Sequence, residues 1–253
     1  MTVMSASVRR EPPRFRLVEV RRVAIVNPCL ARVTLGGAEL AGFAIDEPAA
    51  SVRLLLPFPP SRELVVPTWN GNEFLLADGR RPVIRTFTPL LSADATQLDV
   101  EIVLHDEGVA SKWAADAGSG DPAALSGPGR GYVIDADADV YVIAGDESAI
   151  PAITQLLESL APTSAVSVFV EARDTARRAL PDHPRAGIEW CDSLFDALRD
   201  SEITGDTRVW AAGEAAAMQR IRRHLFEERG IARRQATIRG YWKHGRAGDS
   251  DAD

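Results

Sequence analysis

The chain has 253 residues, of which 45% are hydrophobic and 26% charged, a composition that allows one large or two modest globular domains. Its net charge of −7 argues against general nucleic-acid binding. The two cysteines, Cys29 and Cys191, cannot build a zinc ribbon or a cysteine-ligated iron–sulfur cluster, so electron transfer would need an organic cofactor. The sequence has no long apolar run and no signal-peptide pattern, and we therefore expect a cytoplasmic protein without membrane insertion.

The first half of the chain has the pattern of an antiparallel β-barrel. Short segments alternate between apolar and polar residues and are separated by turns rich in Pro, Gly and Asn. We expect strands at residues 15–26, 31–35, 52–56, 83–88 and 98–104, and one short helix at about 109–117.

The second half alternates strands with helices, which predicts a parallel sheet covered by helices. We expect strands at residues 140–144, 165–170, 188–190, 208–211 and 236–238, and helices at 151–160, 194–198 and 214–229. An acidic connector at residues 135–139 separates the two halves. We therefore predict one domain over residues 13–134 and another over 135–246, with disordered tails at 1–12 and 247–253.

The segment Arg85-Thr86-Phe87-Thr88-Pro89 is the strongest candidate for a flavin site. In a strand, Arg85 and Phe87 share one face, and Thr86 and Thr88 share the other. The guanidinium can pair with a phosphate, the ring can lie on an isoalloxazine, and Thr88 can offer its hydroxyl and its N–H to the reactive edge of a flavin. These residues taken alone also fit an ordinary buried strand that ends at a proline.

A second candidate lies where the strand ending near His105 turns into the short helix. The small residues Gly108, Ala110 and Ser111 would let a pyrophosphate approach the backbone N–H groups of the helix N-terminus. His105 either contacts the cofactor or serves as a capping or surface histidine.

Two strand-to-helix turns in the second half predict a nucleotide crevice, because ligands of parallel sheets bind beyond the carboxyl ends of the strands. The G-x-G-x-x-G fingerprint is absent from the sequence. A helix cap formed by Asp146 or Ser148 is the structural alternative, and both can hold together. The candidate residues at the two turns are Gly145, Asp146, Glu147, Ser148, Gly213 and Glu214.

Basic residues gather between positions 220 and 246, which hold nine Arg or Lys and two Glu. We expect Arg220, Arg222, Arg223 and Arg229 to line a solvated helix face. Beyond that helix, an anion site is the better explanation for Arg233, Arg234, Arg239, Lys243 and Arg246.

Taken together, the fragments at residues 32–37, 85–89, 105–114, 145–152, 212–214 and 240–245 resemble the siderophore-interacting proteins, which are FAD-dependent ferric-siderophore reductases related to ferredoxin reductases. The resemblance extends from about Arg16 to Arg246. It implies a flavin-binding antiparallel barrel followed by an α/β nucleotide-binding domain, as the two patterns predict.

The resemblance also implies roles for individual residues. FAD would lie between the domains, with Arg85 on its phosphate, Phe87 beside the ring system and Thr88 near N5 as the catalytic residue. The further cofactor contacts implied are Thr86, His105, the amides around Gly108, Ala110 and Ser111, and Trp242. The crevice at Gly145–Ser148 and Gly213–Glu214 would receive NADPH or NADH.

Two departures from the family pattern stand out. Phe87 occupies a position where the family usually has tyrosine, so a phenolic hydrogen bond is lost. Ser51-Val52-Arg53-Leu54 replaces a common His-x-Lys-Leu, keeping the cation and losing the histidine.

The implied reaction is release of iron from a ferric siderophore, because the chelate oxygens hold the ferric ion far more tightly than the ferrous ion. We expect a basic mouth of Arg53, Lys243 and Arg246 to attract the anionic chelate. Two alternatives stay open: a flavin reductase of the same fold that serves another acceptor or a partner oxygenase, and a non-catalytic siderophore-binding module. The donor is also open, because Glu171 favours NADH and Arg173 favours NADPH.

Overall fold

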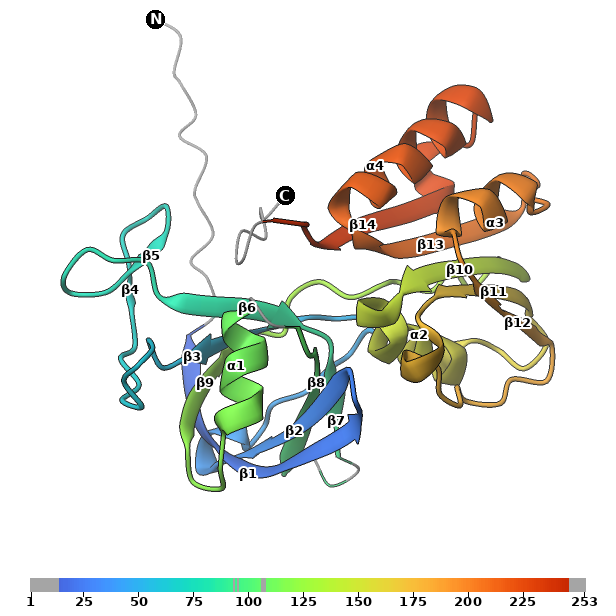
Figure 1. Ribbon diagram of the computed structural model, residues 1–253. Coiled ribbons are helices and arrows are strands. Elements are labelled where there is room, and N and C mark those ends of the chain that lie inside the picture. The colour runs from blue at the N-terminus through green and yellow to red at the C-terminus, as the bar shows by residue number, and fades with distance from the viewer. Residues whose placement is uncertain (1–13, 93, 95, 106–107, 246–253) are drawn as a thin grey trace, which may run out of the picture.

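The computed structural model describes residues 14–92, 94, 96–105 and 108–245. Two sheets lie side by side in it, an antiparallel one from the first half of the chain and a parallel one from the second half (Figure 1). This confirms the predicted fold class. The predicted division between residues 134 and 135 stays a prediction, and the expected disordered tails fall outside the described residues.

Within the described residues, seven antiparallel strands form the barrel sheet in the order β6-β3-β9-β1-β2-β8-β7. They are β1 (Phe15–Asn27), β2 (Leu30–Gly36), β3 (Val52–Leu56), β6 (Val83–Phe87), β7 (Pro89–Leu91), β8 (Gln97–Val103) and β9 (Pro122–Ser126). The edge strands β6 and β7 follow one another in the chain, with Thr88 between them. The sheet therefore curls until its two edges meet at Thr88, which closes it into a barrel.

Strands β7 and β9 were not predicted from the sequence. β9 reads Pro-Ala-Ala-Leu-Ser and lacks the β-branched and aromatic residues that mark strands, and β7 begins with a proline at the edge of the sheet. A small hairpin of β4 (Thr68–Trp69) and β5 (Phe74–Leu75) was also missed. The hairpin projects from the barrel, and the Phe74 ring contacts the rings of Trp69 and Phe15 at 5.1 Å (Figure 1).

The short helix α1 (Val109–Asp116) confirms the prediction for residues 109–117. It packs against β2 and β8 of the barrel, and Ala110 and Ala114 face the apolar core. A 3-10 turn, η1 (Ala38–Leu40), follows β2.

Residues 138–245, which are described throughout, form the parallel domain. Its sheet has the order β12-β11-β10-β13-β14. The strands are β10 (Val140–Asp146), β11 (Ala165–Glu171), β12 (Ala186–Cys191), β13 (Thr207–Glu214) and β14 (Ala236–Trp242). Helix α2 (Ile150–Ser159) covers one face, while α3 (Leu194–Asp200) and α4 (Ala215–Arg223) cover the other.

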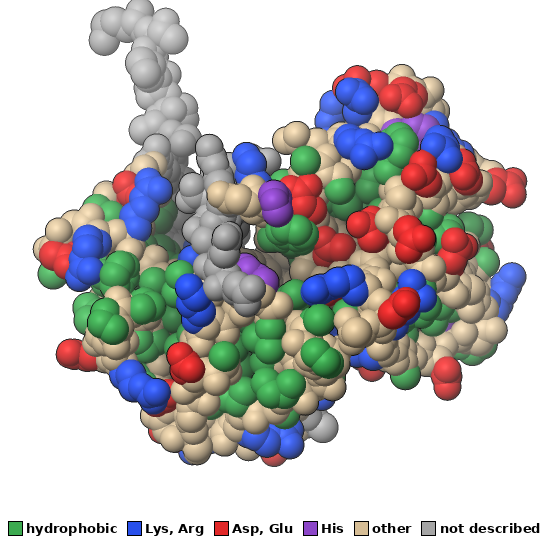
Figure 2. All heavy atoms as spheres, viewed as in Figure 1, with side chains coloured by type: hydrophobic (Ala, Val, Ile, Leu, Met, Phe, Trp, Pro, Cys, Tyr) green, Lys and Arg blue, Asp and Glu red, His purple; other side chains and the backbone are tan. Residues whose placement is uncertain are grey.

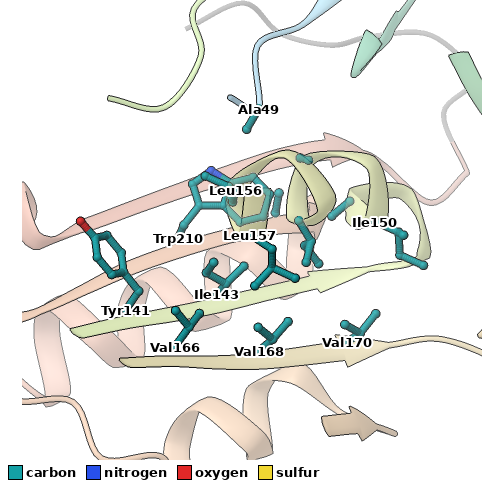
Figure 3. Packing of buried hydrophobic residues seen from close by; sticks show 14 of the residues in the cluster. Ala49, Tyr141, Ile143, Ile150, Leu156, Leu157, Val166, Val168, Val170 and Trp210 are labelled. Carbon is teal, nitrogen blue, oxygen red and sulfur yellow. The ribbon is translucent and has the colours of Figure 1, made fainter. Parts of the chain in front are cut away.

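Alternate residues of each central strand supply the two cores of this domain. Ile143 and Val168 face α2 and pack with Leu156 and Trp210 (Figure 3). Val142, one position before Ile143, faces α3 and α4 instead. Four short helical turns complete the domain: η2 (Glu147–Ala149), η3 (Asp174–Ala176), the π-helical η4 (His224–Glu228) and η5 (Arg233–Gln235).

The expected solvated face of basic residues on the last helix is confirmed for Arg220, Arg222 and Arg223, which are exposed, whereas Arg229 is half-buried. Several of these side chains also contact neighbouring elements. The Arg220 guanidinium lies over the Phe195 ring, Arg222 donates to the carbonyl of Ile238, and Arg229 donates to the carbonyls of Leu198 and Ser201. Arginine combines a long apolar stem with five N–H donors, so it can hold neighbouring elements together as well as face water.

The two domains meet at Ala49, which is buried and belongs to the core beside α2 (Figure 3). Ala49 has a positive φ of 55°. Its N–H donates to the Gln155 side chain at 2.8 Å, and its carbonyl accepts from Arg239 at 3.2 Å. Gln155 also donates to the carbonyl of Pro89 at 2.6 Å, and Arg239 to that of Gly131. The barrel is therefore joined to the parallel domain through backbone groups of its loops.

A buried carboxylate forms a second junction. Glu101 lies on β8 with its side chain 2% exposed, and it accepts hydrogen bonds from Arg32 of the barrel at 2.7 Å and from Arg178 of the parallel domain. Removing one partner of a buried ion pair leaves the other charge without compensation.

In the described part of the chain, no helix is long and apolar enough to cross a membrane.

We expect Glu101→Gln to lower the free energy of unfolding by about 3 kcal/mol, because Arg32 and Arg178 would lose their shared carboxylate in a buried position. Urea unfolding followed by circular dichroism measures the change. The matched control is Glu19→Gln, which removes an exposed ion pair with Arg21 and should change stability by no more than about 0.5 kcal/mol. Equal small losses in both variants would contradict a stabilising role for the Glu101 junction.

Candidate flavin and nucleotide site

The carboxyl ends of β10 and β13 lie next to each other, and the chain continues from β10 to one side of the sheet while β13 and β14 lie on the other. A crevice at such a switch point is where parallel sheets bind nucleotides. A side chain at Gly145 would place its Cβ 2.5 Å from the Cβ of Ala149. At Gly213, where φ is 157°, a Cβ would lie 2.6 Å from Asp146. The two predicted turns therefore lie next to each other, and neither has room for a side chain at its glycine.

Asp146 holds the ends of three strands together. Its carboxylate accepts hydrogen bonds from the N–H of Ser148 at 2.9 Å, from the Ser148 hydroxyl at 2.5 Å, from the N–H of Glu214 at 2.8 Å and from Nε1 of Trp242 at 2.7 Å. Burial raises the pKa of Asp146, and these hydrogen bonds oppose that shift. The cap by Asp146 that the sequence offered as an alternative is therefore present, while its role toward a nucleotide stays a prediction.

The other acidic residues of the crevice also have protein partners. Glu147 forms an ion pair with Arg173 at 2.8 Å. Glu214 accepts from the N–H of Ala217 at 2.9 Å and so caps α4. Because these carboxylates are engaged, an anionic ligand in the crevice would not face three uncompensated negative charges.

The register of β6 on β3 places the predicted flavin residues on two faces. Phe87 pairs with Val52 and Arg85 with Leu54, and both partners are buried in the barrel. Phe87 accordingly packs against the barrel core, and Nη1 of Arg85 donates to the carbonyl of Ile84 at 2.8 Å. The predicted alternation of side chains is therefore present.

Thr86 and Thr88 occupy different surroundings. Thr86 is exposed and pairs with Arg53 on β3. Thr88 is 7% exposed at the closure of the barrel. Burial raises the pKa of the Tyr241 phenol on β14, and the Thr88 hydroxyl opposes that shift. Tyr241 had no predicted role. Successive residues of β14 point to opposite faces of the sheet, so Tyr241 lies on the face opposite Trp242. This alternation is the sequence signal from which a separate role for Tyr241 could have been predicted.

The N-terminus of α1 has the donors that a pyrophosphate needs. Its N-cap is Gly108, and no side chain caps the helix. The first intrahelical bond runs from the N–H of Lys112 to the carbonyl of Gly108, so the N–H groups of residues 109–111 have no partner among the described residues. This donor set fits the pyrophosphate of FAD.

His105 and Ser111 build that helix start. A Cβ at Gly108 would lie 2.5 Å from the His105 ring, so the ring lies directly on the glycine backbone. The His105 N–H donates to the Ser111 hydroxyl at 2.8 Å. The structure therefore brings His105, Gly108, Ala110 and Ser111 together as predicted from the sequence. Residues 106 and 107 lie outside the described residues.

Two of the three residues of the expected basic mouth are described. Arg53 is half-buried on β3, and Lys243 is exposed at the end of β14. Neither cation forms a hydrogen bond or ion pair with any described residue. Arg246 lies outside the described residues. Figure 2 shows acidic side chains gathered on the visible face of the parallel domain.

The anion site expected from Arg233, Arg234 and Arg239 is wrong for Arg239 and stays a prediction for Arg233 and Arg234, which are exposed. The Arg239 guanidinium donates hydrogen bonds to the carbonyls of Ala49, Arg130 and Gly131. The Arg233 guanidinium lies over the Phe226 ring. Sequence reasoning also missed Gln155, whose amide joins Ala49 to Pro89. Gln155 is a polar residue on a largely apolar helix, and the sequence does not indicate which loop of the barrel its side chain will bind.

Comparison with known proteins agrees with this geometry. Residues 19–132 match the siderophore-interacting FAD-binding domain, and residues 138–245 match the siderophore-interacting protein family. The NADPH-dependent ferric-chelate reductase of Escherichia coli is 31% identical over 92% of this chain and 94% of its own length. Ferric vibriobactin reductase ViuB of Vibrio cholerae is 30% identical over 96% and 94%. The crystal structure of a siderophore utilization protein from T. fusca superposes with a TM-score of 0.83, at 35% identity over 95% of this chain and 97% of that one.

We expect Asp146→Asn to lower the free energy of unfolding by about 2 kcal/mol at acid to neutral pH, because the amide cannot accept from two of the present donors. The raised pKa sets the sign of the pH dependence. Because the pKa of Asp146 is raised in the folded protein, protonation of Asp146 favours the folded state. The contribution of Asp146 to the free energy of unfolding is therefore largest at pH values below the ordinary pKa of aspartate, and it is lost as pH rises through the raised pKa. The difference between wild type and variant should therefore narrow as pH rises, as measured by urea unfolding.

Asp200→Asn serves as the control. Arg199 lowers the pKa of the exposed Asp200, so its small contribution should grow rather than shrink with rising pH. A gap for Asp146→Asn that is constant or widens with pH would contradict the assignment.

Proposed function

Because this chain belongs to the siderophore-interacting protein family, we propose that it is an FAD-containing, NAD(P)H-dependent reductase that releases iron from ferric siderophores. The observation that supports this most is the contact between the flavin strand and the nucleotide domain. Gln155 of α2 donates to Pro89, directly after Thr88, and Tyr241 of β14 interacts with the Thr88 hydroxyl. An electron donor in the crevice and an acceptor at Thr88 would therefore be neighbours.

The residues of the barrel would hold FAD in the following way. The N–H groups at the start of α1 would bind its pyrophosphate, and Arg85 would pair with a phosphate oxygen. Phe87 would lie beside the ring system, and Thr88 would offer a hydroxyl near its reactive edge. Bound FAD supplies the exchange between a two-electron donor and a one-electron acceptor.

The nucleotide domain would bind the electron donor at the Gly145 and Gly213 turns, where the absence of side chains lets a pyrophosphate reach the backbone. Asp146 acts here as a positioning residue, because it holds the β10, β13 and β14 ends in register. Trp242, tied to Asp146 by its Nε1, is 46% exposed and offers a ring surface at the junction. The dependence on NAD(P)H favours a cytoplasmic location.

Reduction releases the metal because hydroxamate and catecholate oxygens are hard, anionic ligands that bind the ferric ion much more strongly than the ferrous ion. Each nicotinamide donates a hydride and each ferric ion accepts one electron. Two ferric chelates are therefore consumed for every nicotinamide oxidised.

The purified protein is expected to carry flavin absorbance and to oxidise NADPH or NADH in a reaction that depends on a ferric siderophore. Under anaerobic conditions, a ferrous-selective chromogenic chelator should capture about two ferrous ions per nicotinamide oxidised. Nicotinamide oxidation at the same rate with and without the chelate would instead support a flavin reductase for another acceptor. Colourless protein that binds the chelate without reducing it would support a binding module.

We also expect Arg53→Ala and Lys243→Ala each to raise KM for an anionic ferric chelate by about fivefold, because each removes a cation that makes no ion pair with a described residue. The KM for a neutral ferric hydroxamate should change little, and the difference should shrink at high salt. Arg199→Ala, which removes an exposed arginine of α3, is the control. Unchanged KM values for the anionic chelate in both variants would contradict the basic mouth.

A further inference from the structure

We propose that Tyr241 of β14 is a positioning residue for the bound flavin: its phenol hydrogen-bonds the Thr88 hydroxyl and thereby directs the Thr88 proton toward the reactive edge of FAD. The inference rests on the proposed function, in which Thr88 lies beside that edge. It extends that function, because a side chain of the nucleotide domain would then tune a cofactor held by the barrel. It is carried by the register of β14, the burial of Thr88 and the hydrogen-bonding capacity of the two hydroxyl groups.

The end of β14 carries a bulge at Tyr241. β14 pairs with β13 so that Gly213 lies opposite Gly240 and Glu214 lies opposite Trp242. Tyr241 is therefore the extra residue between two successive pairs. Bulges change the direction of a side chain and are frequent beside active sites. The register shift thus gives Tyr241 a direction that regular pairing would not give it.

The Tyr241 side chain is held against the apolar core beside α2. The Trp210 ring meets the Tyr241 ring edge-on, with 6.4 Å between the ring centres. Trp210 is 1% exposed and is itself fixed in that core (Figure 3). Two residues earlier on β14, Arg239 donates hydrogen bonds to the carbonyls of Ala49 and Gly131 in the barrel loops. The end of β14 therefore contacts the barrel through two side chains, and Tyr241 has little freedom to move away from it.

Thr88 is held from the same side. It lies between β6 and β7 and is 7% exposed. The carbonyl of the next residue, Pro89, accepts a hydrogen bond from the Gln155 amide at 2.6 Å, and the same amide group binds the N–H of Ala49 at 2.8 Å. Helix α2 therefore fixes the backbone that carries Thr88, while Tyr241 binds its side chain. Both contacts come from the nucleotide domain.

The two hydroxyl groups differ in what they can donate and accept. Burial raises the pKa of Tyr241, so its phenol stays protonated at neutral pH, and the side chain that hydrogen-bonds it is Thr88. A buried O–H group needs an acceptor. A threonine hydroxyl has one proton and two acceptor sites, so its oxygen can accept from the phenol and keep its own proton for another partner. The phenol thus fixes the rotation of the Thr88 hydroxyl and polarises it, because hydrogen bonds in a chain strengthen one another.

The partner that the proposed function gives to the Thr88 proton is the reactive edge of FAD. A hydrogen bond donated there withdraws electron density from the ring system and makes the edge a better hydride acceptor. Without the phenol, the Thr88 hydroxyl could rotate, and its donor would be weaker and less well directed. Tyr241 acts in this scheme only through Thr88, so its effect on the flavin depends on the Thr88 hydroxyl.

The test compares the FAD-loaded wild type with Tyr241→Phe, which keeps the ring against Trp210 and removes only the phenol oxygen. The absorbance spectrum and the midpoint potential of the bound flavin, the latter from dithionite titration against a reference dye, should both shift. Stopped-flow reduction of the flavin by NADPH should slow by about fivefold, the size expected for one neutral hydrogen bond. Tyr141→Phe is the matched control, because it removes a phenol of the same core that donates to the carbonyl of Asp135 at 2.8 Å.

A double-mutant cycle separates a positioning role from a structural one. In a Thr88→Val background, Tyr241→Phe should not shift the spectrum or the potential further, whereas in a Thr88→Ser background, which keeps a hydroxyl, it should shift both. Flavin properties unchanged in Tyr241→Phe, an equal shift in Tyr141→Phe, or additive effects with Thr88→Val would overturn the role of Tyr241. Reduction of a ferric chelate by the wild type tests the proposed function separately, because a flavin-loaded wild type that fails there can still show the cycle.

Discussion

The closure of the barrel at Thr88 is the constraint on which the rest of the site depends. The chain leaves one edge of the antiparallel sheet at Phe87 and enters the other edge at Pro89. This removes the two exposed edges that an open sheet would present and forces the predicted flavin strand to the seam of the barrel. The parallel domain packs against that seam, because the Gln155 amide donates a hydrogen bond to the carbonyl of Pro89 and the Tyr241 phenol interacts with the Thr88 hydroxyl.

The same junction shows how polar groups are divided between structure and ligand binding. The charged side chains Glu101, Asp146, Arg178 and Arg239 are consumed by protein partners, and most are buried or half-buried. The N–H groups at the start of α1 and the exposed cation of Lys243 have no partner among the described residues, and these are the groups that we propose for ligand binding. A buried charge without a partner is strongly destabilising, whereas the exposed N–H groups of a helix N-terminus can be hydrated by water until an anion binds.

Much of the architecture could be predicted because it follows from local patterns. The period of two in residues 15–104 and the strand–helix alternation after residue 140 each report which face of a segment is apolar, and burial of that face then decides the fold class. The strands β4, β5, β7 and β9 escaped prediction, since they are short, begin with proline or consist of alanine and leucine. Strands β7 and β9 form because neighbouring strands of the barrel offer unpaired N–H and carbonyl groups, which is a tertiary effect, whereas β4 and β5 pair with each other in a separate hairpin.

By itself, the sequence determined the two-domain organisation, the alternation of Arg85 and Phe87 against Thr86, and the glycine turns at Gly145 and Gly213. Each depends on residues close together in the chain, where backbone geometry leaves few choices. Only the tertiary structure decided which charges are used internally. Glu171 caps α3, Arg173 joins Glu147, and Arg239 holds the barrel loops. These pairings join residues that are distant in sequence, and their geometry exists only once the two domains have packed.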